Sequence, residues 1–128
     1  MTILFDQDNL PEDVLEVIFA TDQQVIVSKE LIKWIKEKGG EVNKTEMSLL
    51  ANALHDGTYE CEIDKPEYRG KKVKLSYNKR QFYDRILTPM RSMGLIDYDL
   101  YRKVYKLSDK FGKNMERIRL LWVRYLNK

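Results

Sequence analysis

The chain has 128 residues, of which 43% are apolar and 34% are charged. This length allows one domain with a sizeable core, and the apolar fraction excludes an intrinsically disordered chain. No apolar run approaches the roughly 20 residues of a membrane span, and the start MTILFDQDNLPED lacks the basic residues of a signal peptide. Since Cys61 is the single cysteine, we expect no disulfide within the chain and no thiolate metal cage. The sequence therefore predicts a soluble cytoplasmic protein with one domain over 1–128.

The net charge of +3 conceals an uneven distribution. Residues 1–64 hold 5 Lys/Arg and 14 Asp/Glu, a net charge of −9, whereas residues 65–128 hold 18 and 6, a net charge of +12. Such an asymmetry favours a nucleic acid or another polyanion as the partner of the basic half. The other interpretation is that the two halves neutralise each other within one fold.

The first predicted elements are two helices with a brief strand between them. Pro11 suits the first position of a helix, and the apolar spacing after it predicts a helix over 11–20. The β-branched run at 25–27 predicts a brief strand. Ser28 is a good N-cap, which predicts a second helix over 29–38 that ends at two glycines.

A third helix completes the N-terminal helical part, 11–56. Asn43 and Glu46 have the spacing of a capping box, so this helix begins after Asn43 and continues through Leu54. The preceding segment GGEVNKT lacks the G-x-x-x-x-G-K-[ST] pattern of a phosphate-binding loop. We interpret it as a loop and helix cap.

Residues 57–77 alternate with the period of a β-strand on both sides of the turn-like segment KPEYRG. They predict a β-hairpin whose first strand is acidic and whose second strand is basic. Opposite charges can pair across the exposed face of such a hairpin.

A fourth helix is predicted over 78–93, followed by Gly94. Its apolar face carries Phe82, Ile86, Met90 and Met93. Its opposite face carries Arg80, Gln81, Asp84, Arg85, Thr88 and Arg91. Pro89 removes one amide donor, so we expect a kink near Thr88.

A second hairpin is predicted over 94–108, with its tip at Leu100, Tyr101 and Arg102. Ser108 then precedes a long last helix over 109–127. The apolar stripe of that helix consists of Phe111, Met115, Ile118, Trp122 and Tyr125 or Leu126. A second apolar edge lies at Leu120 and Val123, roughly opposite the stripe. The helix packs either against a second copy, in a homodimer, or against the first helix of the same chain.

Candidates for catalysis are few. His55 is the single histidine, and its position after an apolar helix favours a surface or capping role. Cys61 alternates with apolar neighbours and is expected to be a small buried residue. The acids Glu60, Glu62 and Asp64 are better explained as a solvated strand face than as a cation site. We predict no enzyme activity, no catalytic residue, no metal and no cofactor.

The run NKRQFYDRILTPMRSMGLIDYDLYRKVYKLSDKFG, residues 78–112, resembles the winged-helix family of DNA-binding domains, especially small prokaryotic, archaeal or viral transcription regulators. Gly94-Leu95-Ile96 matches the end of the family's recognition helix, and Tyr105-Lys106-Leu107-Ser108 matches the return strand of its wing. The resemblance implies a mainly helical α+β fold: a winged helix-turn-helix with an extra β-hairpin before the recognition helix and a long C-terminal helix. That extra hairpin departs from the short turn usual in the family.

The resemblance also implies a DNA-binding surface. The recognition helix would contribute Asn78, Lys79, Arg80, Gln81, Asp84 and Arg85, and the wing would contribute Tyr101, Arg102 and Lys103. The extra hairpin adds Lys71, Lys72 and Lys74 as a second basic projection. Asp84 would repel phosphate, so we expect it to orient Arg80 or Arg85, or to accept from a cytosine amine.

The sequence therefore predicts a transcriptional regulator that binds double-stranded DNA and acts by occupying an operator. The alternative is a winged-helix module for protein–protein interaction within a larger assembly, with the acidic N-terminal half as its working surface. RNA binding is a weaker option, because the aromatic residues do not lie on one sheet face.

Overall fold

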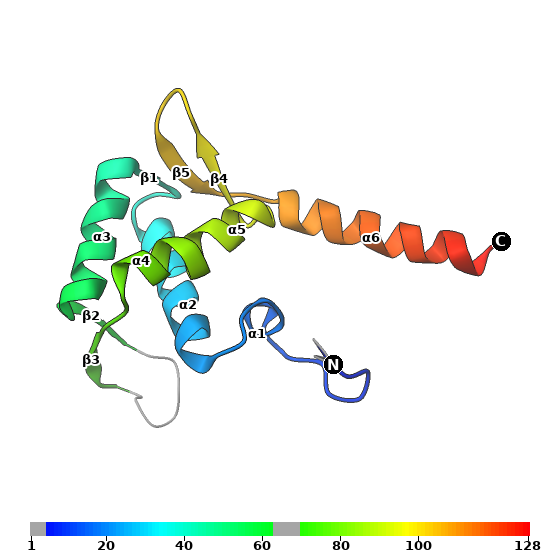
Figure 1. Cartoon of the computed structure of the whole chain (residues 1–128), viewed down its shortest axis with the longest axis horizontal. Coiled ribbons are helices and arrows are strands. Elements are labelled where there is room, and N and C mark those ends of the chain that lie inside the picture. The colour runs from blue at the N-terminus through cyan, green and yellow to red at the C-terminus, as the bar shows by residue number, and fades with distance from the viewer. Residues whose placement is uncertain (1–4, 63–69) are drawn as a thin grey trace.

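The computed structural model of the chain describes residues 5–62 and 70–128 (Figure 1). The protein is α+β and mainly helical with small antiparallel sheets, as the sequence predicts. The first elements are α1 (Val14–Ile18), α2 (Asp22–Glu37), β1 (Glu41–Asn43), α3 (Lys44–Asp56), β2 (Tyr59–Glu62) and β3 (Lys72–Leu75). The later ones are α4 (Lys79–Gln81), the π-helical turn η2 (Phe82–Leu87), α5 (Thr88–Ser92), β4 (Ile96–Asp99), β5 (Val104–Leu107) and α6 (Lys110–Leu126).

Helix α1 is shorter than the predicted 11–20. Its N-cap is Asp13, whose side chain accepts from the amide of Leu15 at 2.9 Å. Phe19 has extended backbone angles and ends the helix. The helix therefore begins at the first side chain that satisfies its free amides, and not at Pro11.

Helix α2 begins earlier than predicted, and the strand expected over 25–27 is wrong. Thr21 is the N-cap, and Val25 and Val27 are buried on the helix. Ser28 is not a cap: it is buried inside the helix, where its hydroxyl donates to the carbonyl of Val25 at 2.8 Å. Burial of the valines against the core outweighs their preference for strands.

The capping box at the start of α3 is confirmed. Asn43 Oδ1 accepts from the amide of Glu46 at 2.7 Å, and Glu46 accepts from the amide of Asn43 at 3.1 Å. The segment before it is a short strand, β1, which was not predicted. With three residues, this strand exists because it pairs with the distant strand β5.

Residues 79–92 form one helical rod in three parts, which we call helix 79–92. Its middle is a π-helical turn that ends just before Pro89, close to the predicted kink. The wider turn buries two consecutive residues, Ile86 and Leu87. The helix ends one residue earlier than predicted: Met93, expected at the end of its apolar face, is the C-cap and is 38% exposed.

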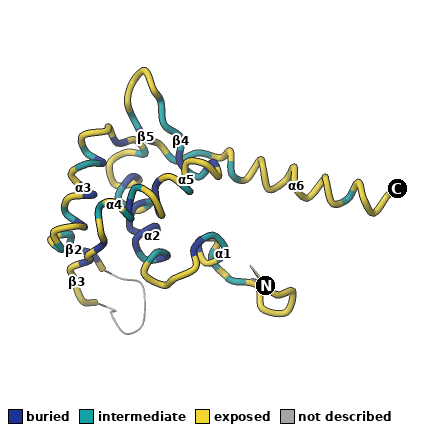
Figure 2. Tube along the Cα trace, viewed as in Figure 1, coloured by how far each residue is buried: buried dark blue, intermediate teal, exposed yellow. Residues whose placement is uncertain are grey.

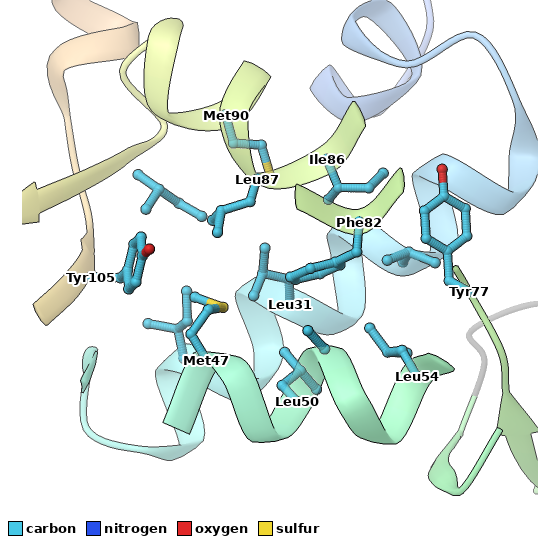
Figure 3. Close-up of a cluster of buried hydrophobic side chains, with 14 of the residues drawn as sticks. Leu31, Met47, Leu50, Leu54, Tyr77, Phe82, Ile86, Leu87, Met90 and Tyr105 are labelled. Atoms are coloured by element: carbon cyan, nitrogen blue, oxygen red, sulfur yellow. The ribbon is translucent and has the colours of Figure 1, made fainter. Parts of the chain in front are cut away.

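The core lies where α2, α3, helix 79–92 and the end of β5 meet (Figure 3). Phe82, Ile86 and Met90 are fully buried, as predicted. From α2 and α3 the side chains of Leu31 and Met47 point toward them. This packing determines which face of helix 79–92 remains in solvent.

Two separate antiparallel sheets flank the helices. One has the strand order β1-β5-β4 and contains the predicted second hairpin. The other contains only β2 and β3, the predicted first hairpin. Its register places Glu60 opposite Lys74 and Glu62 opposite Lys72, which confirms the expected charge matching. Most of the turn KPEYRG lies outside the described residues.

Helix α6 extends away from the rest of the molecule (Figures 1 and 2). Its N-cap is Asp109, and Ser108 Oγ accepts from the amide of Lys110 at 3.2 Å. None of its residues is buried, so the alternative in which it packs against the first helix of the same chain does not occur. Among the described residues, no helix has both the length and the apolar character to cross a membrane.

Candidate nucleic-acid interface

Side chains from two helices fix the start of helix 79–92. Asn78 Oδ1 accepts from the amide of Gln81 at 3.1 Å, which is an N-cap. His55, in the last turn of α3, accepts from the amide of Lys79 through Nδ1 at 3.1 Å. His55 is exposed and has the capping role that the sequence indicated. Together these bonds satisfy amides that would otherwise lack partners and tie α3 to helix 79–92.

The outer face of helix 79–92 carries exposed charge. Arg80 and Asp84 are 91% and 67% exposed, and Nε of Arg80 lies 3.8 Å from Oδ2 of Asp84. Arg85 is also exposed, whereas Lys79 and Gln81 are partly buried. Asp84 thus pairs with Arg80, and not with Arg85, the other arginine that we expected it to orient. Because exposed ion pairs of this kind are weak, Arg80 can exchange Asp84 for another anion at small cost.

The tip of the β4–β5 hairpin is built around one carboxylate. Oδ1 of Asp99 accepts from the amides of Arg102 at 3.1 Å and of Tyr101 at 2.9 Å. These hydrogen bonds, that from Arg102 first, hold the pKa of Asp99 below its ordinary value. Lys103 has a positive φ of 54°, which closes the turn. Tyr101 is 98% exposed, so the tip presents an aromatic ring to solvent.

Arg102 makes an ion pair that the sequence did not indicate. Its guanidinium binds both carboxylate oxygens of Glu41, at 2.9 and 3.3 Å. Glu41 belongs to β1, which pairs with β5 at the edge of the sheet. No periodicity in a three-residue strand could have revealed this partner. The acid neutralises part of the positive charge of the tip.

Arg91 joins the end of helix 79–92 to the sheet. Its guanidinium carbon lies 5.0 Å from the ring centroid of Tyr98 and 5.9 Å from that of Tyr105. The two rings also contact each other, with centroids 4.5 Å apart. Burial raises the pKa of Tyr105, and Arg91 partly offsets that effect. Stacking orients Arg91, which the sequence placed on the outer face but not among the binding residues.

The lysines of the β2–β3 hairpin lie apart from the tip of the β4–β5 hairpin. Figure 1 shows this hairpin and the β4–β5 hairpin near opposite ends of α3. Lys71, Lys72 and Lys74 are exposed, and two of them face Glu62 and Glu60 across the strands. The structure therefore does not bring them together with Tyr101, Arg102 and Lys103, which share one turn.

Within residues 5–62 and 70–128, no three His, Cys, Asp or Glu side chains are placed to hold a metal ion. Cys61 is buried, as expected, and burial raises the pKa of its thiol to about 11, so the reactive thiolate is disfavoured.

Comparisons with protein-family models, with curated proteins and with solved structures gave no match for this chain. Its function is therefore inferred from the geometry described above.

Proposed function

We propose that this protein is a cytoplasmic DNA-binding transcriptional regulator that acts by occupying an operator. In this proposal its fold is a winged helix-turn-helix, with helix 79–92 as the recognition helix and residues 100–103 as the tip of the wing. The order α2, β1, α3, helix 79–92, β4 and β5 supports it, as does the strand order β1-β5-β4. In such a fold the sheet braces the recognition helix and extends the wing beside it.

The observation that carries the proposal is the exposed outer face of helix 79–92. Phe82, Ile86 and Met90 are buried, so the helix cannot rotate, and Arg80 and Arg85 are held in solvent. An α-helix fits the major groove, where arginine reaches guanine and glutamine reaches adenine. Arg80 and Arg85 therefore contact bases or phosphates, and Gln81 lies between them for base contact.

The wing supplies a second contact. Asp99 holds the turn that carries Tyr101 and Arg102. The ring of Tyr101 is exposed, and the guanidinium of Arg102 binds Glu41 at the edge of the sheet. Near a phosphate, Arg102 exchanges its pair with Glu41 for a pair with the nucleic acid. Lys71, Lys72 and Lys74 form a third and weaker contact, because acids on the neighbouring strand compensate two of them.

Fluorescence anisotropy on a labelled random-sequence duplex of about 30 base pairs, measured at several salt concentrations, tests the proposal. We expect binding at low salt that weakens steeply as salt rises. Arg80→Ala and Arg102→Ala should each lower the affinity and reduce the salt slope by about one unit for each bound copy, since each removes one phosphate contact per copy. The control Lys36→Ala removes an exposed cation from α2 and should change neither quantity.

Glu41→Gln is a further variant for the same anisotropy titration, because it removes the carboxylate that pairs with Arg102. We expect a few-fold tighter binding, whereas Glu37→Gln, an exposed acid on α2, should have little effect. If Arg80→Ala and Arg102→Ala leave the affinity and the salt slope unchanged, the assignment of this surface is wrong.

The second candidate function is a protein-interaction module, which the exposed apolar side chains of α6 favour. A wild-type protein that binds neither random nor genomic duplexes at low salt would support this second function and contradict the first.

A further inference from the structure

Helix α6 carries an apolar face that remains in solvent. At 100° per residue, Phe111, Met115, Ile118, Trp122 and Tyr125 form one stripe along it. Four of these are exposed, from 41% for Met115 to 71% for Tyr125, and Leu121 and Leu126 widen the stripe at 44% and 64%. A continuous apolar surface of this kind marks an interaction site.

The direction of α6 is set by the contacts at its first turn. The amide of Phe111 donates to the carbonyl of Gly94 at 3.0 Å, and Nζ of Lys110 lies 3.1 Å from Oδ2 of Asp97. From this point the helix leads away from the other helices. The N-terminal segment of the same chain lies apart from it (Figure 1). In the described part of the chain the stripe remains exposed, which favours a partner outside the chain.

The charge of α6 disfavours a second α6 as that partner. Residues 110–128 contain six Lys/Arg and a single acid, Glu116, a net charge of +5. The stripe has the alternating spacing of four and three residues found in coiled coils. Two such helices side by side would nevertheless bring ten net positive charges together over a short length.

The complementary surface lies at the other end of the same chain. Residues 1–28 contain six Asp/Glu and no Lys or Arg, a net charge of −6. Within this segment we call residues 5–16 the acidic arm, where Phe5, Leu10 and Val14 are 51%, 62% and 47% exposed. The arm thus combines exposed apolar side chains with acids, as α6 combines exposed apolar side chains with cations.

We propose that two copies of the chain exchange these elements, so that α6 of each copy packs on the acidic arm of the other. Phe5, Leu10 and Val14 cover the stripe of α6. The arm's acids pair with the cations that flank it, apart from Asp13, which caps α1 and pairs with Lys29 of its own chain. The contact is made twice around a two-fold axis, which closes the assembly as a dimer. This inference goes beyond the proposed function, because it does not depend on DNA.

Sedimentation velocity on the full chain tests the exchange. At low salt the wild type should have about twice the mass of one chain, 15.3 kDa. Ile118→Glu places a charge in the stripe and should weaken the dimer by about tenfold or more. The matched control Leu120→Glu changes a residue of similar exposure on the opposite side of α6 and should leave the dimer intact. Circular dichroism confirms that both variants fold.

The double variant Asp8→Lys, Glu12→Lys distinguishes the exchange from pairing between two α6 helices. In the exchange it weakens the dimer, and raising the salt concentration weakens the wild-type dimer too. In pairing between two α6 helices the double variant has no effect, and added salt strengthens the dimer by screening repulsion. The second pattern would overturn the proposal, as would a monomeric wild type.

Mixing two variants provides a positive test. Ile118→Glu has an intact arm, and Asp8→Lys, Glu12→Lys has an intact α6, so an equimolar mixture should form a dimer with one working contact. No dimer in this mixture would contradict the exchange. Arg80→Ala should dimerise like the wild type, so failure of the DNA-binding proposal leaves this readout unaffected.

Discussion

At the scale of single residues, several polar side chains acquire their partners from distant parts of the chain. Arg102 binds Glu41 and the amide of Lys79 binds His55, across 61 and 24 residues respectively. Both bonds lie on the surface that we propose for DNA. The chemistry of that surface therefore depends on acids and caps that are remote in sequence.

Glu30 is a buried acid whose charge costs stability. It is 8% exposed on α2, and burial raises its pKa above the ordinary value of 4.5. The folded state then binds more protons than the unfolded state between those two pKa values. Stability therefore falls as pH rises through that window, and the penalty is complete above it.

We expect Glu30→Gln to raise Tm at pH 7 by a few degrees, because the amide has nearly the same shape but carries no charge that burial would penalise. The gain should disappear below about pH 4, where Glu30 is protonated in both states. Thermal unfolding at the two pH values measures this, with Glu12→Gln as control, because Glu12 is exposed and, unlike Glu37, does not act on the pKa of Glu30. An unchanged or lower Tm at pH 7 would refute the assignment.

At the scale of elements, helix ends and helix irregularities decide what faces solvent. The π-helical turn before Pro89 buries Ile86 and Leu87 together and leaves Arg85 outside. Gly94 has a φ of 87°, and a Cβ there would lie 2.9 Å from the amide nitrogen of Phe111. This close approach connects helix 79–92 to the start of α6.

Gly94→Ala should destabilise the protein by about 1–3 kcal/mol, because it combines backbone strain with that collision. Gly112→Ala is the matched control: it lies in α6 with no atom within 4 Å of the added Cβ. It should stabilise by up to about 1 kcal/mol through helix propensity. Urea unfolding of both variants measures the difference, and equal midpoints would contradict this account of Gly94.

At the scale of the whole molecule, the near-neutral total charge is a sum of separated charges. The N-terminal segment is acidic, while helix 79–92 and α6 expose cations. In the proposed dimer the arm neutralises α6, so the cations of helix 79–92 and of the wing remain for the nucleic acid. The dimer would carry two such surfaces, related by its two-fold axis.

Dimer formation and DNA binding should therefore be coupled through duplex length. Ile118→Glu should leave the affinity for a duplex of about 12 base pairs unchanged, since one recognition helix occupies it. On a duplex of about 30 base pairs it should lower the affinity by about tenfold or more, because the two surfaces no longer bind together. Leu120→Glu should match the wild type on both. Equal loss on both duplexes would contradict the coupling.

The sequence by itself determined the elements whose signals are local. The capping box at Asn43, the two alternating hairpins and the apolar face of helix 79–92 depend on neighbouring residues, and the structure confirms them. The charged side chains of helix 79–92 followed from the same periodicity, because a helix that buries one face must expose the other.

Only the tertiary structure decided the features that depend on distant contacts. Val25 and Val27 are buried on a helix where the sequence predicted a strand. Strand β1 exists because β5 pairs with it. The same sheet brings Glu41 to Arg102, and the contact at Gly94 directs α6 away from the body. Propensity and periodicity describe a residue and its neighbours, whereas these outcomes depend on free energies gained between segments far apart in the chain.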